Sequence, residues 1–484
     1  MIRPKKQNSR DHSSARYQHI RATIYGGFLF LVLLSAPGCS LGPSGHVSSG
    51  WTIPAHPFMA ANERSNIHND AYMTDSYSVA GPADGNLTMT TKPMNRLCVS
   101  IAFDSQGAIR TLCTGVDGGR AVYLLDPVTL ATKASYELPS SNSLGAAGAG
   151  YFYIDNLERM VVPTVNKHIF RLEATGNPPA FRIETDFNLT SLPDPAHIES
   201  ALPDWNGRLW FVTEEGVVGT VEKGAAPKTL SLAQMDGAVT VSEGIFNSFA
   251  VDETGGVYVV SDHALYRLDA DVNGTPSVTW REAYDRGTAR KPGQFSQGSG
   301  TTPTLIGRDY VAITDNAEPR MNVLVYKRQR SVAGNRLVCR VPVFEEGSSA
   351  TENSLIAFGN SIIVENNYGY ARPVHFIGKL STPGITRIEF SPDGHCENLW
   401  EAGMIVPSVV SKYSVESGMV YTYTKDTAGW YFTGLSGATG KAVFSKKVGG
   451  DELKFNNHYS GIAIGPDGSA YVGTVGGIIR FARD

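Results

Sequence analysis

Carboxylate, amide and imidazole side chains recur beside the start or the end of short apolar strands along this chain. The candidate ligand-binding residues are Glu199, Glu243, Asn247, Glu352, Asn353, Glu365, Asn366 and His458. Oxygen-rich groups of this kind bind hard cations such as Ca²⁺, and converging carboxylates raise one another's pKa values. Loops are also polar simply because they meet water, so a ligand site and a wet rim both remain open.

Two further segments carry dense polar groups. The stretch Ser65-Asn-Ile-His68-Asn-Asp70-Ala-Tyr72 lies outside the strand pattern, and it either adds His68 and Asp70 to a site or pins a tail by hydrogen bonds. Asp269, Asp271 and Asn273 have the spacing of the early positions of a calcium loop, but Trp280 at position twelve excludes an EF-hand. Asp, Asn and Gly also form ordinary turns, so calcium there is one of two interpretations.

Familiar catalytic signatures are missing from the sequence. It contains no His-Glu-x-x-His, no Gly-x-Ser-x-Gly and no glycine-rich dinucleotide loop after a strand. Gly437-Ala-Thr-Gly-Lys441 lacks the glycine spacing and the following Ser or Thr of a phosphate loop, and it falls in an expected hairpin turn. No catalytic residue can therefore be named, and whether the protein is an enzyme stays open.

The elements that must position these residues are repeats. A strand, a tight turn, a second apolar or aromatic strand and a third strand recur about every fifty residues. The eight copies centre on residues 101–107, 153–157, 202–207, 249–255, 306–308, 358–360, 416–418 and 465–468. One four-stranded sheet cannot cover both of its faces, so neighbouring sheets must stack, and radial stacking closes the array. We expect an all-β propeller of eight four-stranded blades, since a solenoid would have a shorter repeat.

Closure of the ring predicts where the missing strand comes from. The last copy ends after its third strand at 477–484, so the fourth should come from residues 86–91. The expected organisation is an export signal at 1–38, a tether and tail at 39–80, of which residues 41–80 drape over the disc, and a propeller at 81–484. Ligands should use the face where each innermost strand begins and the second strand ends.

Three outer hairpins also resemble a known family. Trp430-Tyr-Phe-Thr-Gly-Leu-Ser-Gly-Ala-Thr-Gly-Lys-Ala-Val-Phe444 is echoed by Tyr123-Leu-Leu-Asp126 and by Arg267-Leu-Asp269 with Trp280. These hairpins resemble the repeat of the PQQ-like, quinoprotein-dehydrogenase-like β-propellers, which implies an eight-bladed disc. The docking tryptophan of that repeat occurs only at Trp280 and Trp400. The adjacent cysteine pair of the quinone-binding members is missing, so PQQ is not an expected cofactor.

The N-terminus has the features of an export signal. Six basic residues precede the apolar run Phe28-Leu-Phe-Leu-Val-Leu-Leu34, which is shorter than the roughly 20 residues that span a bilayer. Cys39 follows small residues, an arrangement that resembles a bacterial lipobox, with Ala36 and Pro37 as departures. We expect an exported lipoprotein, periplasmic or at the cell surface, that is anchored in the membrane through a lipid on Cys39; an uncleaved anchor is the alternative.

Cysteines and charge agree with export. Four cysteines remain after Cys39, as a disulfide-permitting compartment allows. Cys98 and Cys113 face each other in the simplest hairpin register, and Cys339 and Cys396 pair by elimination. Six of the 42 basic and one of the 46 acidic residues precede Cys39, so the remainder is acidic, and nucleic acid is not an expected partner.

The sequence alone leaves three functions open. The favoured one is a binding or scaffold protein of the cell envelope that recognises a protein, peptide or glycan and needs no catalytic group. The second is a metal-assisted hydrolase of lactones or esters, in which calcium polarises a carbonyl and His458, His68 or His263 acts as base. A quinoprotein-like dehydrogenase, suggested only by the resemblance, is the third.

Overall fold

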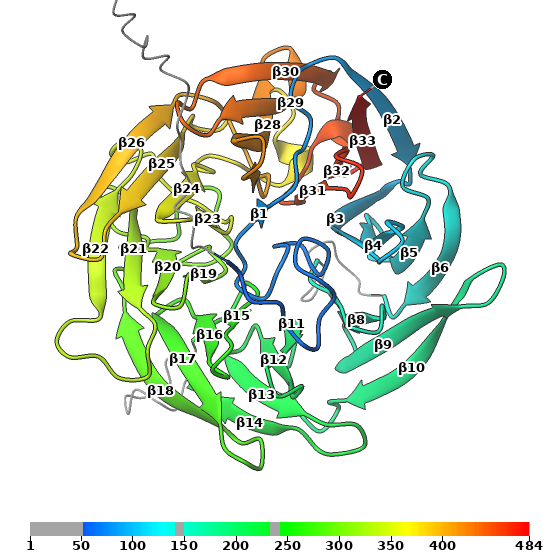
Figure 1. Cartoon of the computed structure of the whole chain (residues 1–484), viewed down its shortest axis with the longest axis vertical. Coiled ribbons are helices and arrows are strands. Elements are labelled where there is room, and N and C mark those ends of the chain that lie inside the picture. The colour runs from blue at the N-terminus through cyan, green and yellow to red at the C-terminus, as the bar shows by residue number, and fades with distance from the viewer. Residues whose placement is uncertain (1–51, 141–149, 233–242, 484) are drawn as a thin grey trace, which may run out of the picture. The chain divides into compact units, whose positions relative to one another are not determined.

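The structure is a computed structural model that describes residues 52–140, 150–232 and 243–483. These residues form a ring of eight blades, each a four-stranded antiparallel sheet, with almost no helix (Figure 1). The predicted all-β, eight-bladed propeller is confirmed, and all eight predicted turns join the first and second strands of a blade. No helix within the described ranges is long and apolar enough to cross a membrane.

The strands of each blade follow the chain from the ring axis outwards. Blade 1 holds β3 (Arg96–Phe103), β4 (Ile109–Gly115), β5 (Arg120–Leu125) and β6 (Thr132–Leu138); blade 2 holds β7 (Tyr153–Ile154), β8 (Met160–Pro163), β9 (His168–Thr175) and β10 (Ala180–Asn188). Blade 3 holds β11 (Ile198–Pro203), β12 (Leu209–Thr213), β13 (Val217–Val221) and β14 (Lys228–Ser231); blade 4 holds β15 (Ala250–Val251), β16 (Val257–Val260), β17 (Ala264–Ala270) and β18 (Pro276–Ala283).

The second half of the ring repeats this order. Blade 5 holds β19 (Thr304–Ile306), β20 (Tyr310–Thr314), β21 (Asn322–Lys327) and β22 (Leu337–Pro342); blade 6 holds β23 (Ile356–Phe358), β24 (Ser361–Glu365), β25 (Ile385–Phe390) and β26 (Cys396–Ala402). Blade 7 holds β27 (Lys412–Ser414), β28 (Met419–Asp426), β29 (Gly429–Ser436) and β30 (Ala442–Gly449), and blade 8 holds β31 (Ile462–Ile464), β32 (Ala470–Thr474) and β33 (Gly477–Arg483). Two 3₁₀ turns, η2 (Pro373–His375) and η3 (Leu453–Phe455), lie in loops.

Burial along the strands follows their place in the blade. All seven residues of β4 are buried, because a central strand is covered on both faces by neighbouring blades. The outer strand β6 alternates between exposed and less exposed residues, since only one of its faces meets a neighbour. The continuous apolar runs of the inner strands thus reflect two-sided burial.

Aspartates close the turns between first and second strands. In blade 1, Asp104 Oδ1 accepts the backbone N–H groups of Gln106 and Ala108 at 3.1 and 2.8 Å, and its Oδ2 binds Arg110. Asp155, Asp204 and Asp252 make the same backbone contacts in the next three blades. These repeated Asp-rich stretches are therefore turns whose polar groups are satisfied within the blade.

The Gly437–Lys441 stretch is a hairpin turn on which the preceding blade docks. Trp400 of blade 6 lies over this turn and donates its indole N–H to the Gly437 carbonyl oxygen at 2.9 Å. Gly440 has a φ of +68°, and a Cβ there would lie 2.5 Å from the Trp400 ring. Both the left-handed backbone and the close ring require glycine at position 440.

The ring closes as predicted. Strand β2 (Leu87–Pro93) pairs antiparallel with β33, from Leu87 opposite Arg483 to Pro93 opposite Gly477, and becomes the outer strand of blade 8 (Figure 1). The expected segment 86–91 overlaps β2 over five residues. Because strands from both ends of the described chain share this sheet, the ring has no open blade edge at the joint.

Residues 59–77, here called the axial segment, run inside the ring, which corrects the expectation of a tail draped over the disc (Figure 1). Its carbonyl oxygens at Ala71, Tyr72 and Thr74 accept the backbone N–H groups of successive innermost strands at Val251, Leu305 and Ala357. Its short strand β1 (Ser76–Tyr77) pairs in parallel with β27. The innermost strands leave one edge unpaired, and the axial segment satisfies those buried donors.

Both expected disulfides are present. Cys98 and Cys113 are register partners in the β3–β4 hairpin, with Cα atoms 4.0 Å apart. The turn shifts the simple register by one residue, and a bulge between Cys98 and Ser100 restores the pairing. Cys339 and Cys396 join the outer strands of blades 5 and 6. Disulfides are typical of proteins outside the reducing cytoplasm, which fits an extracytoplasmic location.

Candidate functional site

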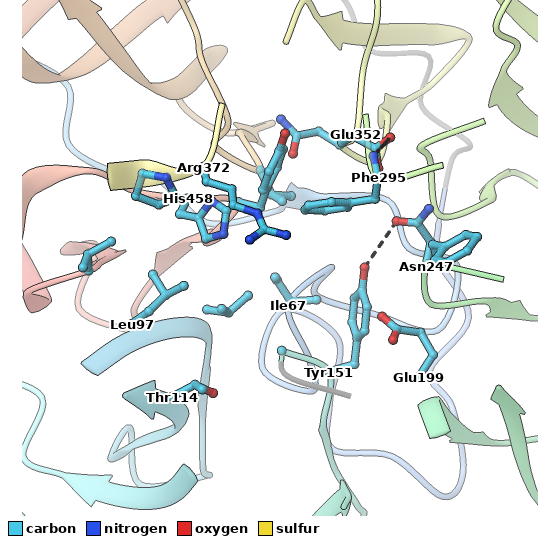
Figure 2. Close-up of a pocket in the computed structure, with 18 of the residues that line it drawn as sticks. Ile67, Leu97, Thr114, Tyr151, Glu199, Asn247, Phe295, Glu352, Arg372 and His458 are labelled. Atoms are coloured by element: carbon cyan, nitrogen blue, oxygen red, sulfur yellow. Dashed lines mark hydrogen bonds between the residues drawn. The ribbon is translucent and has the colours of Figure 1, made fainter. Parts of the chain in front are cut away.

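A pocket of about 540 Å³ opens on the face where the innermost strands begin, the face expected from the sequence (Figure 2). Each blade contributes a residue within or just before its first strand: Val99, Tyr151, Glu199, Asn247, Thr302, Ser354, Val410 and Tyr459. Loops that follow second strands add Val116, Glu214 and Val475. The pocket is therefore centred on the ring axis, and the axial segment supplies Ile67 and His68 to its lining.

The surface of the lining is mostly apolar, although about half of the lining residues carry a polar side chain. Figure 2 shows Arg372, Phe295 and Glu352 along one side, with Leu97 and Thr114 opposite them. Tyr151 and Glu199 lie on a third side, where the Tyr151 hydroxyl reaches Asn247 Oδ1 at 3.5 Å. A largely apolar cavity with a small set of placed polar groups is the common form of a small-molecule site.

A buried ion pair holds the axial segment beneath the pocket. The side chains of Asp75 and Lys412 are both fully buried, and the Lys412 ammonium donates to Asp75 and to the Ile67 carbonyl oxygen. Burial alone would raise the pKa of Asp75, but Lys412 and His68 outweigh that effect and hold this pKa below its usual value. Burial lowers the pKa of Lys412, which Asp75 opposes. Asp75 is thus a carboxylate anchored by its counter-ion.

His68 links this ion pair to the cavity. Its Nδ1 lies 3.1 Å from Asp75 Oδ2 and 3.0 Å from Ser354 Oγ. An ionised carboxylate only accepts hydrogen bonds, so Nδ1 carries a proton, and the other ring nitrogen is Nε2. That Nε2 lies 3.4 Å from the Thr302 hydroxyl, and His68, Thr302 and Ser354 all line the pocket.

Glu352 is a buried carboxyl on the pocket wall with no counter-ion in contact. It is 7% exposed, and its Oε1 accepts the Phe295 backbone N–H at 2.9 Å. Its Oε2 has no hydrogen-bond partner among the described residues. Burial raises the pKa of Glu352 to about 8, so the group is neutral at pH 7 and carries a proton that it can donate.

His458 and Tyr459 are presented to the pocket by an unusual backbone. Both residues have positive φ, 41° and 61°, a conformation that costs energy in residues other than glycine. The Tyr370 hydroxyl donates to Asn456 Oδ1 at 2.8 Å and lies 3.1 Å from His458 Nδ1. Burial lowers the pKa of His458 to about 4, and Arg372 acts in the same direction, so this imidazole is neutral at pH 7.

The structure brings six of the predicted residues to this one pocket and leaves three outside its lining. The six are His68, Glu199, Asn247, Glu352, Asn353 and His458. Glu243 instead accepts hydrogen bonds from Ser261 and Tyr266 inside blade 4 and pairs with Arg281 at 3.2 Å. Whether the six bind a ligand stays a prediction.

Glu365, Asn366 and Asp70 are buried in supporting positions. Glu365 Oε2 accepts the Asn353 side-chain amide at 2.7 Å, and burial raises the pKa of Glu365 to about 8. Asn366 Nδ2 donates to the Ser348 carbonyl oxygen at 2.8 Å. Asp70 accepts the Tyr72 backbone N–H and the Thr74 hydroxyl within the axial segment, and burial raises its pKa to about 7.

The loop expected to bind calcium is an ordered turn. Asp269 pairs with Arg267 at 3.1 Å and with Arg330 at 2.7 Å. Asp271 Oδ1 accepts the backbone N–H groups of Asn273 and Thr275 at 2.9 and 2.8 Å. Each of the two carboxylates thus already has partners, and calcium at Asp269, Asp271 and Asn273 stays a prediction.

A different group has metal-ligand geometry. His197, Glu214 and Glu215 offer three ligand atoms within 4.8 Å of one another, and no other such set of His, Cys, Asp and Glu occurs in the ranges that the structure describes. His197 Nδ1 lies 2.6 Å from Glu215 Oε1, and Glu214 reaches the pocket. All three side chains are partly exposed.

Several pocket residues had no distinguishing signal in the sequence. Arg372 lies in the long connection between β24 and β25, and Phe295 in the one between β18 and β19, neither of which follows the repeat. Asp75 and Lys412 are 337 residues apart and meet only because the axial segment enters the ring. The dense polar stretch at 65–72 was the one indication of that segment.

Comparisons with known proteins establish the fold only. No family model matches the chain. An uncharacterized protein of Archaeoglobus fulgidus is 26% identical over 373 residues, which cover 71% of this chain and 72% of that protein. Europium-containing methanol dehydrogenase aligns with a TM-score of 0.55 and 11% identity, over 84% of this chain and 89% of its own. The two chains share a fold.

Two looser structural likenesses carry no argument about function. A streptogramin B lyase aligns with a TM-score of 0.41 and 11% identity over 83% of this chain and all of its own. BamB from Moraxella catarrhalis aligns with a TM-score of 0.35 and 14% identity over 87% of this chain and 99% of its own.

The lining of the pocket does not match the quinone cofactor of the family that the outer hairpins resemble. The described lining contains no cysteine, and the four cysteines of the described chain form disulfides within blade 1 and between blades 5 and 6. The expectation that PQQ is not bound stays a prediction, and no chemistry is derived through it.

Proposed function

We propose that this chain is an exported, lipid-anchored binding protein of the cell envelope that captures a ligand in its axial pocket. The observation that carries the proposal is a cavity of about 540 Å³ at the channel mouth, lined by all eight blades and by the axial segment. The volume suits a small molecule or the end of a peptide or glycan chain. Export is supported by the N-terminal sequence and by the two disulfides.

The binding proposal is tested by filling the pocket. Val116 lines the pocket and is 67% exposed, so Val116→Trp adds bulk there without disturbing the core. The matched control is Val272→Trp, since Val272 is 95% exposed on an outer hairpin. We expect wild type and V272W, purified from the native host, to carry the same small molecule in native mass spectrometry and V116W to lose it. Equal occupancy in all three would contradict binding in the axial pocket.

The anchor is tested separately by replacing Cys39. We expect Cys39→Ser to move the protein from the membrane fraction to the soluble fraction and to abolish labelling by a lipid precursor. If the variant stays in the membrane fraction, the lipid anchor is wrong, while the pocket proposal is unaffected.

A metal-assisted hydrolase is the second candidate, and one observation favours it. His197, Glu214 and Glu215 can supply three ligand atoms, and Glu214 lines the pocket, so a cation bound there would polarise a carbonyl beside it. Elemental analysis of the purified protein decides the matter: a stoichiometric ion that His197→Ala removes supports the hydrolase. A metal-free protein that melts identically with and without chelator excludes it.

A further inference from the structure

Two hydrogen-bond donors stand on the same side of the axial pocket without an internal acceptor. Arg372 is exposed, lines the pocket and makes no ion pair with any residue that the structure describes. Glu352 lines the same side, and its Oε2 lacks a partner within the described chain although the residue is only 7% exposed (Figure 2). A buried polar atom left without a partner costs free energy, and a ligand that accepts from it recovers that cost.

Glu352 can act as a donor because of its surroundings. Its Oε1 already accepts the Phe295 N–H, and the cation whose field reaches it, Arg290, only partly offsets the effect of burial. The carboxyl therefore stays protonated at pH 7, and Oε2, which is shielded from solvent and has no partner within the described chain, is the oxygen left to make a further hydrogen bond. A guanidinium together with a carboxylic acid O–H matches an anionic, two-oxygen acceptor.

The rest of the cavity favours a hydrocarbon body. Apolar side chains form much of its lining, among them Ile67, Leu97, Val99, Val116, Leu453 and Val475. Burying a hydrocarbon chain against such a wall is favourable by about 25 cal/mol per Å². The other two acidic residues of the lining, Glu199 and Glu214, belong to blade 3, and burial raises the pKa of Glu214.

We propose that the axial pocket binds an organic carboxylate with an apolar body, its carboxylate held by Arg372 and Glu352 and its hydrocarbon part by the apolar wall. This inference rests on the proposed binding function and names the ligand class of that site.

The test compares three probes of one length on the mature protein by isothermal titration calorimetry at pH 6.5. Hexanoate, hexanol and hexylammonium share the hydrocarbon chain and differ only in the head group. We expect hexanoate to bind at least about ten-fold more tightly than hexanol, and hexylammonium most weakly. Tighter binding of hexylammonium or equal binding of all three overturns the proposal. In the first case the acidic residues would determine the affinity, and in the second the apolar wall would.

Two variants assign the contacts. Arg372→Met should weaken hexanoate about ten-fold or more and leave hexanol unchanged. The control Arg308→Met should change neither, because the Arg308 side chain is 81% exposed on the β19–β20 turn. If R372M binds hexanoate like wild type, Arg372 does not hold the carboxylate and the proposal is wrong.

The pH dependence isolates Glu352. Ionisation above pH 8 removes its donor and adds a negative charge, so hexanoate affinity should fall about ten-fold from pH 6.5 to 9. Glu352→Gln keeps a neutral donor and should bind hexanoate equally at both pH values. The other titratable or charged groups that face Glu352 or share its pocket are Arg290, Arg372, Glu199, Glu214, His68, His458, Tyr151 and Tyr459. A fall that persists in E352Q assigns the pH effect to one of them and contradicts the role of Glu352.

The ligand found by native mass spectrometry separates this proposal from the binding function. A co-purified acid that V116W loses supports both. A co-purified neutral or cationic molecule leaves the binding function standing and overturns the carboxylate class, and no bound molecule together with no binding of any probe overturns both.

Discussion

Two carboxyl groups are buried near the axis of the ring, and they are held in opposite charge states. Asp75, in the axial segment, is ionised against Lys412, and both side chains are fully shielded from solvent. Glu352, on the pocket wall, has no counter-ion in contact and is neutral at pH 7. The paired carboxylate joins two distant parts of the chain, whereas the unpaired carboxyl lines the cavity with one oxygen that has no partner within the described chain. The difference separates a group that stabilises the fold from one suited to a ligand.

Breaking the ion pair should have the largest effect. Lys412→Met leaves Asp75 as a buried charge without a partner, and we expect the free energy of unfolding to fall by about 3–5 kcal/mol in urea denaturation. The control Lys223→Met should change it by less than about 0.5 kcal/mol, because the Lys223 side chain is 69% exposed. Adding Asp75→Asn to K412M should recover part of the loss. A K412M variant as stable as wild type would mean that the pair does not hold the axial segment.

The neutral carboxyls should make stability fall as pH rises. Glu352 and Glu365 have folded-state pKa values raised to about 8, so each binds a proton more strongly in the folded than in the unfolded chain. The stability that they contribute is complete below about pH 4.5 and is lost as pH rises through 8. We expect a loss of ~2–4 kcal/mol from pH 6.5 to 9 by urea denaturation.

Variants show which groups cause this slope of the free energy of unfolding against pH. Glu352→Gln and Glu365→Gln should each flatten it, whereas Glu346→Gln should not, because the Glu346 side chain is 65% exposed. His458 does not interfere above pH 6.5, since its lowered pKa makes it lose stability only as pH falls from 6.5 through 4. An unchanged slope in both E352Q and E365Q would show that these carboxyls are ionised in the fold.

A change in the ring should lower stability without touching the pocket. Trp400→Ala removes the ring that packs on Gly440 and the hydrogen bond to Gly437, and we expect a loss of about 1–3 kcal/mol in urea denaturation. Hexanoate affinity should stay as in wild type, because Trp400 lies in the outer strand of blade 6. A parallel loss of affinity would show that the ring and the axis are not independent.

Calcium should have the smallest effect. The sequence predicts an ion at Asp269, Asp271 and Asn273, but those carboxylates already have partners. We expect millimolar calcium to raise the melting temperature by no more than about one degree relative to chelator, and Asp271→Asn to abolish that rise. A rise of many degrees would make this loop a major metal site.

The sequence predicted the ring much better than the axis. Eight copies of one strand–turn–strand pattern, the first four with an aspartate at the turn, define eight blades because each blade buries its faces against its neighbours in the same way. The closing strand followed from counting strands in the last copy, and Cys98 and Cys113 followed from hairpin register. All of these depend on residues close together in sequence or on repetition.

The axial segment and half of the pocket could not be predicted in this way. Asp75 contacts Lys412, and Arg372 lines the pocket, because of segments that occur only once in the chain and do not belong to the repeat. Polar loop positions did indicate the face on which the pocket opens and six residues of its lining. They could not distinguish Glu352, which faces the cavity, from Glu243, which is used within blade 4, because both precede an innermost strand.

The most direct test of the account is to observe the protonated Glu352 in infrared difference spectra at pH 7, with and without hexanoate. We predict a carboxylic-acid C=O band that shifts when hexanoate binds, together with its absence from the difference spectrum of Glu352→Gln. The band of Glu365 should stay in place, because that residue lies outside the pocket lining. A difference spectrum identical in wild type and E352Q would contradict the claim that a neutral carboxyl at the axis receives the ligand.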